Sequence, residues 1–195
     1  MDKQTIETYN REAENIAQLH AQLKPERIYQ LVEQYFLPGR KTADIGCGIG
    51  RDTDWLNQHG FPTLGIDGSE AMLKQAQSLY PNHEFLQDYL PDLPTLGNCV
   101  FQNILCSAVL MHLPKCQLVP ACERLFSLLE EKGCLMISWR NTTHSNQREN
   151  GKLYESIEPI FLETLFRQLN AKILLPESQT EKARALIWQM LVIQK

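Results

Sequence analysis

The stretch that decides the fold is Lys41-Thr42-Ala43-Asp44-Ile45-Gly46-Cys47-Gly48-Ile49-Gly50-Arg51-Asp52-Thr53. Residues 42–45 predict a short strand, and a helical pattern follows from Arg51 to His59, where Gly60 ends it. Between them the glycines recur with the spacing G-x-G-x-G. Glycine adopts positive φ readily and lets a ligand approach the backbone closely. The stretch therefore predicts a nucleotide-binding corner; the alternative is a tight strand-to-helix turn that binds nothing.

Length and composition are those of a soluble globular domain. The chain has 195 residues, of which 43% are hydrophobic and 22% charged. A net charge of −4 argues against a broad cationic surface for nucleic acid. The apolar runs are too short to cross a bilayer, and the first residues lack the apolar segment of a signal peptide. We expect a cytoplasmic monomer or homodimer that binds neither membrane nor nucleic acid.

The cysteines show no pattern of a metal or disulfide site. There are six of them, at positions 47, 99, 106, 116, 122 and 134, and none forms a C-x-x-C pair. Most fall in segments that predict strands or helices. We expect them to be reduced, small, buried residues, with no disulfide framework and no metal.

The chain before the glycine stretch predicts two helical segments. Residues 5–23 are polar with a weak apolar stripe, which favours a helical arm. Pro25 suits the first turn of a helix, and apolar residues at i, i+3, i+4, i+7 and i+8 from Ile28 to Phe36 predict an amphipathic helix. We expect a single domain over 1–195, with an N-terminal arm or lid at 1–24 and a core at 25–195.

The chain after the glycine stretch alternates between strands and helices. Strands are predicted at 61–67, 83–89, 102–109 and 134–139, with a helix capped by Ser69 and another from Leu113-Pro114 to Glu131, closed by Gly133. Residues 140–152 predict a loop, and Ser156 is expected to cap a helix that runs to Leu169. The last strands are predicted at 171–175 and 186–193. Only about ten residues separate them, too few for a parallel crossover, so they should pair antiparallel.

This alternation predicts an α/β fold. We expect a doubly wound, Rossmann-like sheet of seven strands, mostly parallel with an antiparallel last strand and with helices on both faces. Ligands of such sheets bind at the carboxyl ends of the strands. Asp44, the glycine turn, Asp67, Asp88 and Ser107 all fall at or near those ends.

Two strand-end acids are candidate ligand residues. Asp67 ends the second strand, where a carboxylate can accept both hydroxyls of a ribose; the alternative is an acid that complements the dipole of the following helix. Asp88 ends the third strand, where it can accept an adenine amino group; the alternative is a solvated acid. Asp92 is the competing acid nearby.

Arg51 and His112 have two interpretations each. A cation is locally unfavourable at a helix N-terminus, so Arg51 either faces the carboxylate of an amino-acid ligand or pairs with Asp52 or Asp54. His112 follows the fourth strand. It is either a base at the rim of the cleft or a packed histidine with satisfied hydrogen bonds.

Four segments resemble the motifs of class I S-adenosylmethionine-dependent methyltransferases, in the order of that family. The first is Ala43-Asp44-Ile45-Gly46-Cys47-Gly48-Ile49-Gly50-Arg51-Asp52, and the second is Leu64-Gly65-Ile66-Asp67-Gly68-Ser69-Glu70-Ala71-Met72-Leu73. The others are Phe85-Leu86-Gln87-Asp88 and Leu105-Cys106-Ser107-Ala108-Val109-Leu110-Met111-His112-Leu113. The resemblance covers nearly the whole chain and includes the reversed last strand. One departure is Asn170, which stands where a glycine is usual; Asn tolerates a left-handed helix cap.

The resemblance implies a role for each matched position. It implies that Asp44 and the turn with Gly46, Cys47, Gly48 and Gly50 hold the methionine part of S-adenosylmethionine, and that Asp67 binds its ribose. Gly68 and Met72 would line the adenosine pocket, Asp88 would bind adenine with Tyr89 packed beside it, and Cys106 or Ser107 would offer backbone to the ammonium. Similar enzymes often begin with a Tyr-Asn or Tyr-Asp element, which makes Tyr9 a candidate for closing over the cofactor.

The resemblance implies an enzyme that moves a methyl group from S-adenosylmethionine to an acceptor and releases S-adenosylhomocysteine. A chain of this length has little room for a separate substrate domain, so a small-molecule acceptor is expected. Two alternatives are a non-catalytic S-adenosylmethionine-binding module and a nicotinamide-dependent oxidoreductase. The glycine spacing, one residue short of G-x-G-x-x-G, and the terminal hairpin argue against the oxidoreductase.

Overall fold

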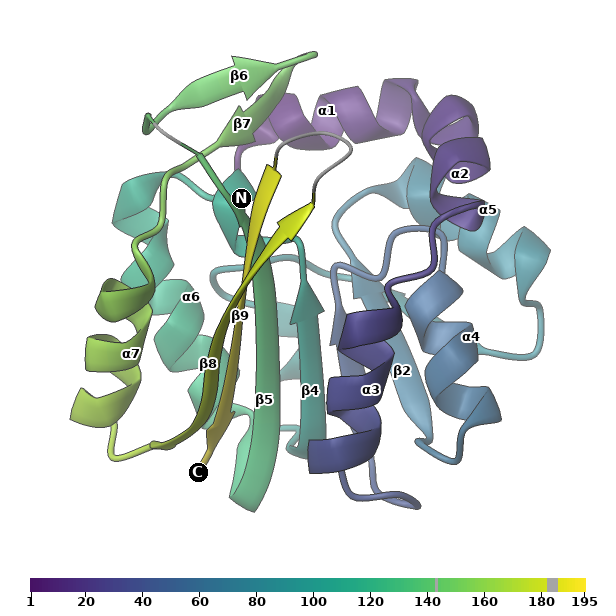
Figure 1. Ribbon diagram of the computed structural model, residues 1–195. Coiled ribbons are helices and arrows are strands. Elements are labelled where there is room, and N and C mark those ends of the chain that lie inside the picture. The colour runs from purple at the N-terminus through teal and green to yellow at the C-terminus, as the bar shows by residue number, and fades with distance from the viewer. Residues whose placement is uncertain (143, 182–185) are drawn as a thin grey trace.

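The computed structural model describes residues 1–142, 144–181 and 186–195, and their centre is one seven-stranded sheet (Figure 1). The strand order is β3-β2-β1-β4-β5-β9-β8. The bounds are β1 Thr42–Ile45, β2 Thr63–Asp67, β3 Glu84–Gln87, β4 Phe101–Ser107, β5 Leu129–Asn141, β8 Lys172–Glu181 and β9 Leu186–Gln194. Neighbouring strands pair in parallel except β9, which is antiparallel to both β5 and β8. The predicted doubly wound sheet with a reversed last strand is confirmed.

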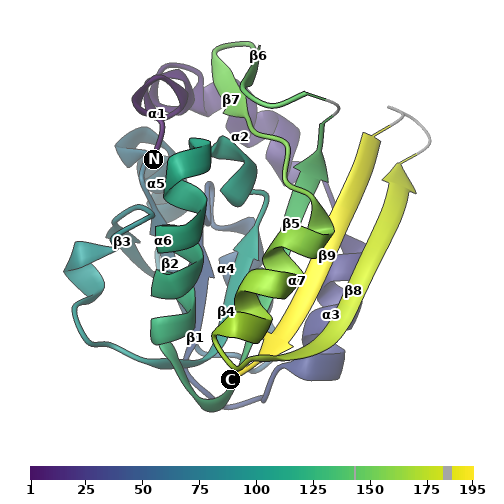
Figure 2. The same cartoon turned by 90° about the vertical axis from the view of Figure 1, so that its left-hand side faces the viewer.

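Helices cover both faces of this sheet (Figure 2). Helices α3 Glu26–Tyr35, α4 Arg51–Gln58 and α5 Glu70–Leu79 belong to one layer, and α6 Lys115–Ser127 and α7 Pro159–Gln168 to the other. Because side chains alternate along a strand, β4 serves both layers. Leu105 packs in the core with Leu31 of α3, while Ile104 packs in the core with Leu118 of α6. Residues 101–106 of β4 are all buried, as expected for a strand covered on both faces. The polar Asn103 among them is satisfied by hydrogen bonds to the Leu37 carbonyl and the Thr42 hydroxyl.

The N-terminal arm consists of two helices, α1 Lys3–Arg11 and α2 Ala13–Ala21, with a break at Glu12. Asp2 caps α1 by accepting a hydrogen bond from the backbone N–H of Thr5. Helix α1 crosses the edge of the sheet where the parallel strands end (Figure 1), in contact with α5 and with β7 Lys152–Tyr154. The arm therefore lies over the edge at which ligands of this fold bind.

Residues 140–152 differ from the predicted loop. They end β5 and then form β6 Gln147–Glu149, which pairs antiparallel with β7 in a small separate hairpin. The hairpin stands beside α1 (Figure 1). Short polar strands carry little periodic signal, which explains why the prediction missed them.

Two predicted helix ends are also wrong. Helix α6 ends at Ser127, and β5 already begins at Leu129, so Gly133 lies inside a strand and does not close the helix. Glu158, not Ser156, precedes α7; the Ser156 hydroxyl donates to the carbonyl of Thr142 at 2.8 Å. The departure at Asn170 is accommodated as predicted, with φ 65°.

Two of the cysteines also differ from expectation. Cys47, Cys106, Cys122 and Cys134 are buried, but Cys99 and Cys116 are exposed. All six are free thiols. Of the helices that the structure describes, none is both long and apolar enough to cross a membrane.

Short 3-10 turns complete the fold: η1 Pro94–Leu96 follows β3, and η2 Leu110–His112 follows β4. Turn η2 is buried and carries His112 to the same edge of the sheet as the glycine turn.

Candidate functional site

A cavity of about 720 Å³ opens at the carboxyl ends of the strands. Its walls come from the glycine turn, the ends of β2, β3 and β4, turn η2, helix α1 and the β6–β7 hairpin. Most of the candidate residues line it: Tyr9, Gly46, Cys47, Gly48, Arg51, Asp67, Gly68, Met72, Asp88, Tyr89, Ser107 and His112. Three candidates do not line it, namely Asp44, Gly50 and Cys106.

The glycine turn needs glycine for two separate reasons. Gly46, Gly48 and Gly50 have φ of 77°, 56° and 77°, in the left-handed region. A Cβ on Gly46 would stand 2.2 Å from Cγ2 of Val109, so tight packing also excludes a side chain there. A Cβ on Gly48 would meet only Cε of Met72, at 3.5 Å. The backbone at Gly48 is thus bare toward the cavity, which leaves room for a ligand.

Asp67 joins the end of β2 to the glycine turn. Its Oδ2 accepts a hydrogen bond from the backbone N–H of Gly48 at 2.9 Å, and its Oδ1 accepts one from the N–H of Ser69 at 2.8 Å. Burial raises the pKa of this carboxyl above its usual value, while the backbone donors oppose the rise. Each oxygen keeps a further acceptor position for a ligand hydroxyl.

Asp88 lines the cavity, whereas Asp92 does not. The Asp88 side chain is buried, and its two oxygens accept hydrogen bonds from the backbone N–H groups of Tyr89 at 2.9 Å and Thr95 at 2.8 Å. Asp92 is exposed, and its backbone carbonyl accepts a hydrogen bond from Arg124. The position of Asp88 supports it over Asp92 as the ligand residue.

Arg51 follows the second of its two interpretations. Its guanidinium forms two parallel hydrogen bonds with Asp52, Nε to Oδ1 at 2.8 Å and Nη2 to Oδ2 at 2.9 Å. Its Nη1 donates to the carbonyls of His20 at 3.3 Å and Leu23 at 3.4 Å. The residue therefore ties the end of α2 to the start of α4, at the wall of the cavity.

Asp44 stabilises the glycine turn from outside the cavity. Its Oδ2 accepts a hydrogen bond from Oγ1 of Thr53 at 2.7 Å, which holds β1 against the first turn of α4. Burial, together with the negative charge of Asp52, raises the pKa of Asp44. Its contact with a ligand stays a prediction, as do the ligand contacts of all the other candidate residues.

His112 is buried, and the structure defines the roles of both ring nitrogens. Nδ1 lies 2.6 Å from the carbonyl oxygen of Leu153, and because a carbonyl only accepts, Nδ1 carries the proton. Nε2 is then an acceptor and lies 3.3 Å from the hydroxyl of Tyr9. Burial lowers the pKa of His112 to about 4, and the Leu153 carbonyl opposes that effect. The ring is thus neutral near pH 7, with its basic nitrogen on the cavity side.

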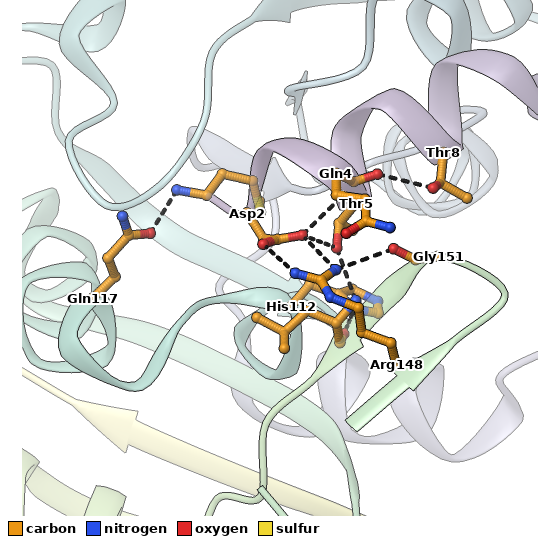
Figure 3. A network of polar contacts seen from close by, with 10 residues as sticks. Asp2, Gln4, Thr5, Thr8, His112, Gln117, Arg148 and Gly151 are labelled. Carbon is orange, nitrogen blue, oxygen red and sulfur yellow. Dashed lines mark hydrogen bonds and ion pairs between the residues drawn. The ribbon is translucent and has the colours of Figure 1, made fainter. Parts of the chain in front are cut away.

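A polar network holds this ring in place (Figure 3). Arg148 of β6 pairs with Asp2 at 2.9 Å, and Asp2 accepts a hydrogen bond from the Thr5 hydroxyl at 2.8 Å. The same hydroxyl oxygen accepts the backbone N–H of Leu153 at 2.9 Å, next to the carbonyl that binds His112. Helix α1, the hairpin and η2 therefore form one connected unit.

The sequence interpretation missed Asp2, Thr5, Arg148 and Leu153 as site residues. Asp2 and Thr5 have the spacing of a helix cap, which was a usable signal. Nothing local signals Arg148 or Leu153, because their places depend on the unpredicted hairpin. Within the described residues, no group of three or more His, Cys, Asp or Glu side chains could hold a metal ion.

The fold and the site together define a class of protein. A seven-stranded sheet with one reversed strand, a glycine turn after its central strand and acids at the next two strand ends is the arrangement that the resemblance to class I methyltransferases implies. Residues 43–133 match the family model described as a methyltransferase domain. The resemblance of the motifs is thereby confirmed over these residues.

Known proteins agree with that assignment. An uncharacterized methyltransferase of Synechocystis is 31% identical over 110 residues, which are 55% of this chain and 51% of the relative. A trans-aconitate 2-methyltransferase of Rhodopseudomonas palustris is 35% identical over 103 residues, which are 50% of this chain and 38% of the relative. The chain spans about half the length of the curated relatives it matches.

The structural similarity extends over more of the chain than the sequence similarity does. The crystal structure of 1,6-didemethyltoxoflavin-N1-methyltransferase from Burkholderia thailandensis, with bound 1,6-didemethyltoxoflavin and S-adenosylhomocysteine, has a TM-score of 0.79. The alignment covers 98% of this chain and 87% of that one, at 16% sequence identity. At this identity the likeness shows the fold, including the N-terminal arm and the C-terminal strands.

Proposed function

We propose that this protein is an S-adenosylmethionine-dependent methyltransferase that moves a methyl group to a small-molecule acceptor. One observation carries the proposal: a single cavity joins a bare glycine turn, the strand-end carboxylates Asp67 and Asp88, and the neutral His112. The glycine turn and the two carboxylates suit a nucleoside with an amino-acid tail. His112 suits an acceptor that loses a proton.

The residues of the cavity wall fit the cofactor. Gly48 leaves space beside its backbone, and Asp67 has acceptor positions for two ribose hydroxyls. Asp88 offers a buried carboxylate for the adenine amino group, with Tyr89 beside it. S-adenosylmethionine, when bound, supplies a methyl group on a sulfonium that keeps the electron pair of the broken C–S bond.

His112 is proposed as the general base. An acceptor oxygen or nitrogen attacks well only when its proton can leave, and Nε2 of His112 is an unprotonated nitrogen at the cavity wall. Taking that proton makes the ring an imidazolium, and the hydrogen bond from Nδ1–H to the Leu153 carbonyl stabilises that charge. The Tyr9 hydroxyl, which faces Nε2 at 3.3 Å, marks where an acceptor hydroxyl would lie.

The remaining residues position and enclose the reactants. Methyl transfer requires the attacking atom about 3 Å from the carbon and in line with the leaving sulfur. Helix α1 and the β6–β7 hairpin cover the cavity and would exclude water, as a competing nucleophile must be excluded. A cavity of about 720 Å³ is within the range of small-molecule sites, which supports a small acceptor.

The test is transfer of labelled methyl from S-adenosylmethionine to a cell extract divided into small-molecule and macromolecular fractions. The proposal expects label in the small-molecule fraction with the wild-type protein and none with Asp67→Ala. Label in protein or RNA alone would contradict a small acceptor. Tight binding of S-adenosylmethionine with no transfer to either fraction would favour the alternative, a non-catalytic module that binds the same ligand.

A further inference from the structure

Five side chains form a continuous row along the cavity beside His112. The ammonium of Lys152 lies 4.8 Å from the ring centroid of Tyr9, which packs edge-on against His112 with 5.9 Å between centroids. On its other side His112 packs edge-on against Tyr154 at 4.8 Å, and the guanidinium of Arg140 lies 3.8 Å from the Tyr154 centroid. All five residues line the cavity. The row thus has aromatic side chains in its middle and a cation at each end.

In the part of the chain that the structure describes, the cation at one end forms no ion pair. Among residues 1–142, 144–181 and 186–195, no carboxylate lies within 4.0 Å of the Lys152 ammonium. The side chain is only partly exposed, and burial lowers the pKa of Lys152, while the charge of Glu12, which itself pairs with Arg11, opposes that effect. A partly buried ammonium that contacts only a ring face is a poorly compensated charge.

The cation at the other end is only partly satisfied. Nη2 of Arg140 donates to Glu149 at 2.5 Å, on the solvent side of the hairpin, where the Glu149 side chain is 48% exposed. The Arg140 side chain is 11% exposed, and its Nε is buried with no hydrogen-bond partner in the described part of the chain. A buried donor without an acceptor is unfavourable, and an incoming anion would satisfy it.

The carboxylates that line the cavity form no ion pair with Lys152 or Arg140 in the described part of the chain. Asp52 pairs with Arg51, and Asp67 and Asp88 belong to the proposed cofactor end. Glu181 accepts a hydrogen bond from Nε1 of Trp188 at 3.1 Å. Glu26 is exposed in the first turn of α3. The row beside His112 is therefore a locally cationic part of a protein whose net charge is −4.

We propose that this row binds an anion, with Lys152 as the residue that holds it, and that the acceptor is a small planar molecule bearing a carboxylate. The carboxylate would be held by Lys152 at one end of the row and attracted by the positive charge of Arg140 at the other end, while the rings of Tyr9 and Tyr154 contact the planar body. An O–H or N–H on that body would then face Nε2 of His112 in place of the Tyr9 hydroxyl. This inference rests on the proposed function, because it names the acceptor for the same cavity.

The experiment uses two probes of equal shape that differ in charge, benzoate and benzamide. The protein is first saturated with S-adenosylhomocysteine, and each probe is then titrated with ligand-observed NMR. We expect benzoate to bind at least tenfold more tightly than benzamide. Equal affinity for the two, or no detectable benzoate binding, would overturn the proposal. If S-adenosylhomocysteine itself fails to bind, the proposed function fails, and the probes titrated alone still decide whether the anion subsite exists.

Variants connect the preference to the two cations. Lys152→Gln should remove most of the preference for benzoate, and Lys24→Gln, which changes an exposed lysine of the same cavity, should leave it intact. Arg140→Gln removes the positive charge at the other end of the row, and it should weaken benzoate severalfold while the protein still binds S-adenosylhomocysteine. Loss of the preference in Lys24→Gln but not in Lys152→Gln would place the subsite elsewhere and contradict the proposal.

Discussion

The carbonyl oxygen of Leu153 accepts a 2.6 Å hydrogen bond from Nδ1 of His112 and so fixes the tautomer of a buried, neutral imidazole. The N–H of the same residue donates to Thr5 on α1, so the position of the ring depends on a helix more than a hundred residues away in the sequence. The arm that covers the cavity therefore also positions the nitrogen that we propose as the base.

Thr5→Val should disturb the tautomer of His112 without unfolding the domain. The substitution keeps the shape but removes the acceptor for the Leu153 N–H, a bond that contributes about 0.5–1.5 kcal/mol. Nitrogen-15 NMR of the imidazole should show a single Nδ1–H form in the wild type and a mixture in the variant. Thr8→Val is the matched control, because the Thr8 hydroxyl donates only to the Gln4 carbonyl within α1. Identical spectra for Thr5→Val and wild type would contradict the coupling.

His112 should make the free energy of unfolding depend on pH. Its pKa is about 4 in the folded protein, below its ordinary value of 6.5, so the unfolded chain binds the proton more tightly. Stability from this group is fully present above pH 6.5 and is lost as the pH falls toward 4. Between pH 8 and 5.5 the loss is about 1.4 kcal/mol.

The comparison is between wild type and His112→Asn in urea unfolding at those two pH values. The Asn amide keeps a donor toward the Leu153 carbonyl but does not titrate. Burial also lowers the pKa of His20 to about 4, but that contribution is present in both proteins and cancels. An equal pH dependence for the two proteins would show that His112 does not titrate as described.

Local sequence determined those features of the candidate site whose positions in the fold were predicted. The glycine turn needs positive φ at Gly46, Gly48 and Gly50, and only glycine adopts that freely, so the turn is visible in the sequence. Asp67 ends β2 and Asp88 follows β3, and both strands are predicted from their own local sequence. Ser69 accepts the Met72 N–H at 3.2 Å, as a helix cap at that position should.

Tertiary contacts determined the parts that were missed. The β6–β7 hairpin is polar and short, and its place against α1 depends on the pair Arg148–Asp2 and on the Thr8–Gly151 packing. The sequence left three partners open for Arg51, namely an external carboxylate, Asp52 and Asp54. Only the folded geometry identifies Asp52. Strand β5 begins five residues early because Leu129 pairs beside Phe101, a contact with no local signature.

The N-terminal arm should become protected when the cofactor binds. Helix α1 buries only Thr5 and Thr8, so it docks largely through polar contacts and should open readily. Amide exchange in residues 1–20 should be fast in the free protein and markedly slower with S-adenosylhomocysteine, while β4 stays protected in both states. Equal protection of the arm in both states would indicate a permanently packed helix. Deleting residues 1–20 should cost cofactor affinity and leave the core folded.

Asp88→Ala should weaken S-adenosylhomocysteine binding, and Asp92→Ala should not. Asp88 is a buried carboxylate of the cavity wall, and a hydrogen bond to such a group contributes about 1.5–3 kcal/mol, or roughly tenfold to a hundredfold in affinity. Asp92 is exposed and lies outside the wall, which makes it the matched control. A larger loss for Asp92→Ala would exclude Asp88 as the adenine ligand.

Calorimetric titration of S-adenosylhomocysteine into the wild-type protein and into Asp67→Ala tests the central claim most directly. Asp67 holds the glycine turn through Gly48 and offers its remaining acceptor positions to the ribose hydroxyls. We predict saturable one-to-one binding by the wild type and a loss of about 1.5–3 kcal/mol, at least tenfold, in the variant. No binding by the wild type, or equal affinity in the two proteins, would contradict the assignment of this cavity to S-adenosylmethionine.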